Sequence, residues 1–264
     1  MIFERLAAAL HAEAPVALVT RVDGVQAGAK MLVFPDDALG DLGSSGLNVA
    51  AAAEAQALLA VGETAMRTFG EDGEPVGMDV RVFIVSYAPK PAMYVFGAID
   101  FSRAMARIGK YLGYRVTVVD ARPIFATKQR IPDADEVVVA WPDEFLSNAP
   151  VDHRTALIVL THDVKFDIPL LQVALKTDAA YIGAMGSRRT HANRVEALRA
   201  AGISETDLAR ISAPIGLDIG ARTPEETAIS IAAEIVALRE RRHGGRLNEG
   251  SLPVHNDRSV ASAS

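Results

Sequence analysis

The sequence predicts an α/β protein in which a smaller α+β domain precedes a doubly wound parallel sheet. After residue 89, short apolar stretches alternate with amphipathic helical stretches, which is typical of a parallel sheet covered by helices on both faces. Before that point, β-rich stretches are separated by turn sequences. Half of the 264 residues are apolar and 23% are charged, so the chain can bury a core. The later part is therefore expected to be a Rossmann-like domain.

The first domain is expected to span residues 1–88 as a small unit of short antiparallel strands with one or two helices. The pair Asp23-Gly24 predicts a turn between the first two strands, and the Gly-, Asp- and Ser-rich segment 36–45 predicts a loop. Gly62 is placed to end the helix. The strands are expected at Val16–Thr20, Ala29–Phe34 and Val80–Tyr87, and the helix at about 46–60.

The second domain is expected to span residues 89–242, after the stiff connector Ala88–Pro91. Thr223 and Glu226 form a T-x-x-E capping box at the start of its last helix, with Pro224 at the first helical position. Residues 243–264 are rich in Gly, Asn and Ser and are expected to be a disordered tail. Strands are predicted at Met93–Phe96, Arg115–Asp120, Val137–Ala140, Ala156–Leu160 and Ala179–Met185, and helices at Phe101–Leu112, Ile168–Lys176, 188–201 and 224–242.

Composition excludes several functions. The net charge of −6 does not favour a general nucleic-acid binder. The chain has no cysteine, which excludes disulfides, thiolate nucleophiles and iron–sulfur clusters. The apolar runs are too short for a membrane span, and the start MIFERLAAAL lacks the basic residues of a secretory signal. A cytoplasmic protein without a membrane or nucleic-acid partner is expected.

Ligands of doubly wound sheets bind beyond the carboxyl ends of the strands, so these ends hold the candidate site residues. Gly97-Ala-Ile-Asp-Phe-Ser102 stands where dinucleotide-binding domains carry G-x-G-x-x-G, but only its first glycine, Gly97, is present. Ile99 and Asp100 favour a structural turn over a pyrophosphate site. Asp120 follows 23 residues after Gly97 and is either a ribose acceptor or a carboxylate that ends a strand, with Arg122 beside it.

Two further strand ends carry polar groups. Thr161, His162 and Asp163 follow the apolar strand ALIVL; they either contact a ligand or cap the next helix. A histidine without a second candidate ligand nearby does not favour a metal site, so none is expected.

The segment Gly186, Ser187, Arg188 and Arg189 opens a helix with two arginines at the positive end of its dipole. This placement indicates an anion site, and the alternative is a pair of solvated arginines.

Long segments of the chain resemble the xanthine dehydrogenase accessory (XdhC/CoxI) family. YIGAMGSRRTHANRVEALRAAGI and APIGLDIGARTPEETAISIAAEIVALR resemble its C-terminal Rossmann domain, as do THD at 161–163 and DARPIFATKQRIPDAD at 120–135. VALVT, AGAKMLV and GDLGSSGLN resemble its N-terminal domain. The resemblance spans about residues 15–240. It implies a protein that binds molybdenum cofactor and helps insert it into molybdenum hydroxylases such as xanthine or carbon monoxide dehydrogenase.

The chain departs from the family pattern at three places. In the N-terminal loop, Gly46 stands where the family's cysteine is expected and Asn48 where its glutamate is expected. Asp23-Gly-Val-Gln replaces a longer segment before the GAKMLV strand, and GAID at 97–100 replaces a GAGH-like loop. A role that needs the family's cysteine therefore does not transfer to this chain.

Three functions follow as hypotheses, and whether the chain catalyses any reaction stays open. The first is an accessory protein that binds molybdenum cofactor as a transient ligand and docks on a molybdenum hydroxylase-type enzyme, with a homodimer as one possible state. The second is an NAD(P)-dependent oxidoreductase, disfavoured by Ile99 and Asp100. The third is a cofactor-free scaffolding paralogue. The expected cofactor-binding residues are Gly97, Asp120, Arg122, Thr161, His162, Asp163, Gly186, Ser187, Arg188 and Arg189.

Overall fold

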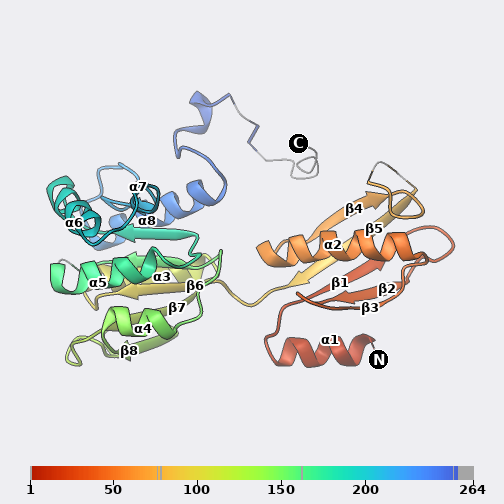
Figure 1. Cartoon of the computed structure of the whole chain (residues 1–264), viewed down its shortest axis with the longest axis horizontal. Helices are drawn as coiled ribbons and strands as arrows, with labels where there is room; N and C mark the ends of the chain where they lie inside the picture. The colour runs from red at the N-terminus through yellow and green to blue at the C-terminus, as the bar shows by residue number, and fades with distance from the viewer. Residues whose placement is uncertain (1, 76, 78, 162, 252, 255–264) are drawn as a thin grey trace. The chain divides into compact units, whose positions relative to one another are not determined.

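The computed structural model describes residues 2–75, 77, 79–161, 163–251, 253 and 254. Within these ranges the chain forms two compact units, which meet in sequence between Pro89 and Lys90 (Figure 1). Each unit has its own sheet and its own buried core, and the two are described separately below.

The first unit is built on an antiparallel sheet of five strands in the order β3-β2-β1-β5-β4. Helix α2, Ser45–Val61, covers one face, where its alanine and leucine side chains meet the inward side chains of the strands. Helix α1, Ile2–His11, packs Leu6 and Ala9 on the other face (Figure 1). The strands are β1 Val16–Arg21, β2 Lys30–Val33, β3 Ala38–Gly40, β4 Ala65–Phe69 and β5 Val80–Tyr87.

The ends of α2 follow local sequence signals. The Ser44 side chain accepts a hydrogen bond from the Leu47 amide and so caps the helix start. Gly62 ends the helix in the left-handed conformation, as predicted, with φ at +73°. Three elements were not predicted. Helix α1 and strand β4 were missed, and β3 lies inside the segment 36–45 that was expected to be a loop.

The second unit contains a six-stranded sheet in the order β11-β10-β9-β6-β7-β8. All of its strand pairs are parallel, which confirms the predicted doubly wound sheet. From β6, the chain first builds outward through β7 and β8, and then crosses back to add β9, β10 and β11 on the other side. The strands are β6 Ala92–Phe96, β7 Arg115–Asp120, β8 Glu136–Val139, β9 Ala156–Val159, β10 Tyr181–Ala184 and β11 Ile211–Ser212.

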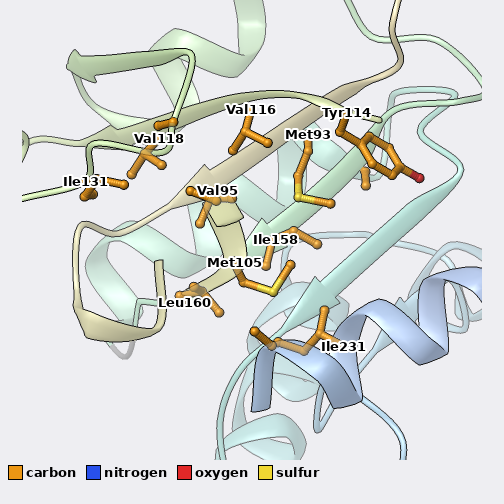
Figure 2. Packing of buried hydrophobic residues seen from close by; sticks show 14 of the residues in the cluster. Met93, Val95, Met105, Tyr114, Val116, Val118, Ile131, Ile158, Leu160 and Ile231 are labelled. Carbon is orange, nitrogen blue, oxygen red and sulfur yellow. The ribbon is translucent and has the colours of Figure 1, made fainter. Parts of the chain in front are cut away.

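Helices cover both faces of this sheet, and each face has a separate hydrophobic core. Helices α3, Asp100–Tyr111, and α8, Pro224–Arg239, contribute to the first core. Figure 2 shows part of it, with Met105 of α3 and Ile231 of α8 in one cluster with the strand residues Val95 and Ile158. The second core lies under α4 Pro142–Asn148, α5 Val164–Ala174, α6 Arg188–Ala200 and α7 Glu205–Leu208.

Helix starts in the second unit repeat the chemistry read from the sequence. The Thr223 side chain accepts from the Glu226 amide, and the Glu226 carboxylate accepts from the Thr223 amide, so the capping box of α8 is confirmed. Helix α5 begins four residues before the predicted position, because Asp163 caps it. Helices α4 and α7 were not predicted.

In the predicted tail, the described residues include one exposed 3-10 turn, Leu247–Glu249, whereas residues 252 and 255–264 lie outside the described ranges.

Candidate functional site

The second unit has a cavity of about 580 Å³ at the carboxyl ends of β6, β7 and β9. Strands β6 and β9 are neighbours at the point where the order of the sheet reverses. This topological switch point is where open α/β sheets bind their ligands, and the volume is that of a small-molecule site. Its lining consists of Gly97, Ile99, Asp120, Ala121, Arg122, Pro142, Leu160, Thr161, Asp163, Val164 and Phe166.

Gly97 allows the ends of β6 and β9 to approach each other. Its φ is +102°, a conformation that side chains disfavour. A Cβ on this residue would also lie 2.9 Å from Cγ2 of Thr161 and 3.3 Å from its backbone nitrogen. The first glycine of the predicted loop therefore has two structural reasons to be glycine.

The rest of this loop is a closed turn. The Ser102 hydroxyl donates to the carbonyl oxygen of Gly97 and accepts from the Ile99 amide at 3.3 Å. Asp100 is exposed and is the first residue of α3, while the Ile99 side chain lines the cavity. These contacts favour the structural interpretation of the loop.

Asp120 is buried at the end of β7, and the protein itself occupies both of its carboxylate oxygens. Oδ1 accepts from the backbone N–H and from Nε of Arg122, each at 2.9 Å. Oδ2 accepts from the Ala98 amide at 2.7 Å and from Nη2 of Arg122 at 2.8 Å. Burial disfavours the charged form, but the hydrogen bonds from Arg122 and Ala98 outweigh it and lower the pKa of Asp120. Asp120 thus has no oxygen without a protein donor to offer to a ribose.

Arg122 binds this carboxylate and also lines the cavity. Its side chain is 46% exposed, and its guanidinium group stacks over the Phe125 ring at 4.5 Å from the centroid. Arg130 approaches the same ring at 5.2 Å. The hydrogen bonds to Asp120 raise the pKa of Arg122, so this residue keeps a fixed positive charge at the cavity wall.

At the end of β9, Thr161 and Asp163 line the cavity, whereas His162 lies outside the described residues. The Asp163 carboxylate accepts from the Lys165 amide at 2.9 Å and caps α5. The Thr161 hydroxyl donates to Asp167, which is fully buried. Asp167 in turn forms a buried ion pair with Arg194 of α6. This pair has no signal in the sequence, because the two residues are separated by 27 positions and belong to different helices.

One part of the cavity wall is apolar. Pro142, Val164 and Phe166 lie on it, and the Trp141 ring packs against the Phe166 ring at 5.1 Å between centroids. Trp141 is partly exposed, and Lys165 lies over its ring at 4.9 Å. This wall was not predicted, although a proline after the only tryptophan of the chain marks the start of α4 in the sequence.

The fourth predicted strand end is not part of the cavity lining. Ser187 caps α6 and accepts from the Thr190 amide at 3.1 Å, as its position before the helix predicted. Arg188 and Arg189 are exposed, and within the described ranges neither forms an ion pair with a carboxylate. Gly186 has a φ of +146°. The predicted residues therefore fall into two groups, one at the cavity and one at the start of α6.

In the first unit, the loop before α2 is held by its own side chains. Asn48 accepts from the Leu42 amide at 2.8 Å and donates to Asp41 at 2.9 Å. Arg21 is buried and donates to the Leu42 carbonyl oxygen at 3.1 Å and to Glu71 at 3.2 Å. Asn48, which stands where a glutamate was expected, thus uses both atoms of its amide within the loop.

The parallel sheet, with its cavity at the switch point, defines the second unit as a domain of the Rossmann type. The family model described as the XdhC Rossmann domain matches residues 93–235, more than half of the chain, and the model described as the XdhC and CoxI family matches residues 9–70. The chain belongs to the XdhC and CoxI family, which confirms the resemblance seen in the sequence.

Two relatives have functional names. One is a probable subunit of xanthine dehydrogenase from Bacillus subtilis strain 168; the two proteins are 33% identical over 161 residues, which cover 61% of this chain and 47% of that protein. The other is the molybdenum cofactor insertion chaperone PaoD of Escherichia coli K12, which is 29% identical over 163 residues, covering 62% and 45% respectively.

Another relative is the uncharacterized protein YqeB of Escherichia coli K12, 30% identical over 181 residues, which cover 69% of this chain and 33% of YqeB. The chain thus spans less than half the length of these curated relatives. A crystal structure of a xanthine dehydrogenase from Bacillus halodurans superposes with a TM-score of 0.67 at 24% identity, covering 90% of this chain and 66% of that one, and it supports the fold. None of the helices in the described ranges could span a bilayer, since the longest has 17 residues.

Proposed function

We propose that this chain is an accessory protein that binds a phosphate-bearing ligand of the pterin type, the molybdenum cofactor, and passes it to a molybdenum hydroxylase-type enzyme. The cavity at the switch point carries this proposal. It joins an apolar wall with Phe166 and Pro142, suited to a flat heterocycle, to the fixed cation of Arg122. The names of two relatives, a molybdenum cofactor insertion chaperone and a probable xanthine dehydrogenase component, support the same class of cargo.

The cationic start of α6 supplies the second part of the proposed site. Gly186, Ser187, Arg188 and Arg189 hold the phosphate, while Gly97, Asp120, Arg122, Thr161 and Asp163 form the crevice for the remainder of the ligand. Helix N-termini attract anions through their free amides, and arginine matches the geometry of phosphate oxygens. In this proposal, Asp120 acts by holding Arg122, because its own oxygens are already occupied.

The absence of cysteine limits the role to carrying a finished cargo. Thiolates are the side chains that carry persulfide sulfur and bind soft metals. A chain without them cannot hold transferable sulfur covalently on its own side chains, so any sulfuration step belongs to a partner.

The contacts of the cavity disfavour the oxidoreductase alternative. An NAD(P) site of the Rossmann type uses a glycine at the Ile99 position and a free carboxylate near Asp120. Here Ile99 lines the cavity and Asp120 is saturated by protein donors. Arg122, which could face a 2′-phosphate, is held to Asp120 by two side-chain hydrogen bonds.

The test compares ligands and variants of the full chain. Purified protein is incubated separately with molybdenum cofactor and with NADPH, and thermal shift and retention through gel filtration are measured. We expect retention of molybdenum cofactor alone, and at least tenfold weaker binding in the variant with both Arg188→Ala and Arg189→Ala. The matched control carries Arg199→Ala and Arg239→Ala, which remove two exposed charges elsewhere in the unit.

Each contrary outcome has a distinct meaning. Stabilisation by NADPH alone would favour the oxidoreductase. If neither ligand binds to the protein, the cofactor-free scaffold would be favoured. If the Arg188/Arg189 variant binds molybdenum cofactor within twofold of the affinity of the unmodified chain, the phosphate site does not lie at the start of α6.

A further inference from the structure

We infer that the buried pair of Asp167 and Arg194 is a positioning device that prepares the ends of β9 and β10 for an anion. The inference rests on the proposed phosphate site at the start of α6. The side chains of Asp167 and Arg194 are each only 1% exposed, and Nε of Arg194 donates to Asp167 at 2.9 Å. Both residues lie behind the strand ends, on helices α5 and α6, and not in the cavity lining.

The ends of parallel strands pose an electrostatic problem for an anionic ligand. Strands that end at a common edge leave backbone carbonyl oxygens there, and these oxygens repel phosphate. Arg194 binds two of these oxygens, because Nη1 donates to Met185 at 2.7 Å and Nη2 donates to Thr161 at 3.3 Å. One buried guanidinium group therefore donates to a carbonyl oxygen after β9 and to another after β10.

The contact with Met185 also sets the direction of the next amide. In a planar trans peptide, the C=O and the following N–H point in opposite directions. Because Arg194 holds the Met185 carbonyl inward, the N–H of Gly186 points away from Arg194. The amides of Gly186 and Ser187 make no backbone hydrogen bond within the described ranges, so both remain donors for a ligand.

Gly186 is the residue that lets Arg194 reach this carbonyl. A Cβ at position 186 would lie 3.1 Å from Nη1 of Arg194 and 3.2 Å from Cβ of Thr190, and the φ of +146° disfavours any side chain. The glycine, the buried cation and the turn before α6 thus form one arrangement.

Asp167 keeps the buried cation neutralised and fixes Thr161. A carboxylate can only accept hydrogen bonds, so the Thr161 hydroxyl is the donor in its hydrogen bond with Asp167. Toward a ligand, that hydroxyl can then act only as an acceptor. The same pair therefore leaves the amides of Gly186 and Ser187 as donors and the Thr161 hydroxyl as an acceptor. An anion would bind at the two amides, and an N–H or O–H group of the ligand would bind at Thr161.

A purely structural role is the competing explanation, and Arg210, an exposed arginine that also binds carbonyl oxygens, serves as the control for it. Arg210 donates to the carbonyl oxygens of Leu175 and Thr177 at 2.8 Å each, and to Ala179 at 3.4 Å. These carbonyls precede β10, whereas Met185 and Thr161 follow strands. Arg210 thus does the same bonding at the opposite edge of the sheet, where no ligand is proposed.

The experiment measures binding of inorganic phosphate to the full chain by calorimetry and by amide NMR, well below the unfolding temperature. The test variant carries Arg194→Met and Asp167→Leu, since replacing both members of a buried ion pair with apolar residues of similar volume is often neutral or stabilising. We expect at least tenfold weaker phosphate binding in this variant. Arg210→Met is expected to lower the unfolding temperature but to leave phosphate affinity within twofold.

Two further readouts complete the test. In the unmodified chain, phosphate should shift the amide signals of Gly186 and Ser187, and shifts confined to other residues would overturn the inference. Arg194→Lys keeps the charge but cannot reach all three partners, so its phosphate affinity should fall between those of the unmodified chain and the double variant; this variant also serves if the double variant does not fold.

The outcomes separate this inference from the proposed function. If phosphate binding is lost with Arg188→Ala and Arg189→Ala but unchanged in the Arg194/Asp167 variant, the anion site stands and the positioning role is wrong. If phosphate does not bind the unmodified chain, or the Arg188/Arg189 variant binds it equally well, the anion site itself is wrong and the inference falls with it.

Discussion

The backbone carbonyl oxygen of Asp72 lies 2.0 Å from the point where a Cβ on Gly46 would stand. A Cβ on Gly73 would in turn lie 2.5 Å from the carbonyl oxygen of Gly46. The segment around Asp72 therefore packs directly on the start of α2 and leaves no room for a side chain there. Gly46 stands where the resemblance to the family predicts a cysteine, and the packing of Asp72 leaves no space for a side chain at that position.

Gly46→Cys should therefore destabilise the first unit by about 1–3 kcal/mol, the usual cost of forcing atoms into a packed site. Urea unfolding of the full chain measures this change. Gly245→Cys is the matched control, because no atom lies within 4 Å of its Cβ position and its backbone is not left-handed. Equal stability of the two variants would show that the segment at Asp72 moves away at little cost.

Replacing Asp120 by Asn should lower the free energy of unfolding at neutral pH by about 2 kcal/mol, because charged hydrogen bonds to Arg122 are lost while Arg122 stays partly hydrated. Folding lowers the pKa of Asp120 from its usual 3.8. The ionised carboxylate therefore stabilises fully above that value, and the contribution disappears as the pH falls through the lowered pKa. Unfolding curves of both proteins should converge in acid; a difference independent of pH would contradict the ionic explanation.

Gly97→Ala should destabilise the second unit by about 1–3 kcal/mol, because it adds backbone strain and a contact with Thr161. Gly113→Ala separates the two effects. Gly113 also has a positive φ, +86°, but no atom lies within 4 Å of its Cβ position. Thermal unfolding should show a larger drop in unfolding temperature for Gly97→Ala than for Gly113→Ala. The difference between the two drops reports the contact that the close approach of β6 and β9 creates. Equal losses would mean that strain alone makes Gly97 necessary.

NAD should bind poorly, with Ile99 as the main obstacle, because its side chain keeps a pyrophosphate away from the backbone. Calorimetry on the unmodified chain measures this, and a micromolar dissociation constant would overturn the prediction. Ile99→Gly should improve NAD affinity only modestly, since the Asp120 carboxylate still has its four protein donors.

Removal of residues 243–264 should leave the fold and ligand binding intact, with a stability change below about 0.5 kcal/mol. Two contacts of this segment are a hydrogen bond from Arg242 to the Pro253 carbonyl at 2.7 Å and the approach of Gly244 to Leu217. Thermal unfolding and light scattering of a chain ending at Arg242 test this. A shorter truncation, after Val254, is the control. If only the chain that ends at Arg242 aggregates, the contact between Gly244 and Leu217 is needed to shield Leu217 from solvent.

Local signals in the sequence predicted the parts of the fold that depend on neighbouring residues. The capping box of Thr223 and Glu226, the stop at Gly62 and the strand that ends at Asp120 each involve residues a few positions apart. Strand β4 was missed because Ala65–Phe69 owes its conformation to pairing with β5, and its sequence alone is ambiguous.

The candidate site shows the same division. Asp120 and Arg122 are two positions apart, and their proximity follows from the sequence. The contacts of Arg194 with Thr161 and Met185 join three elements, so only the folded chain brings them together. The Gly46 position is a further case, since the space that excludes a side chain is created by Asp72, 26 residues later.

The central place of β6 has a consequence for synthesis of the chain. Strand β6 is the first strand of its sheet to leave the ribosome, and β7 and β8 follow and can pair on one side of it. Its other edge must wait for β9, whose Ala156 pairs with Met93. During this interval an apolar strand edge is open, and such edges recruit strands from other molecules. This edge of β6 therefore stays unpaired at least until residues 156–159 of β9 have been synthesised.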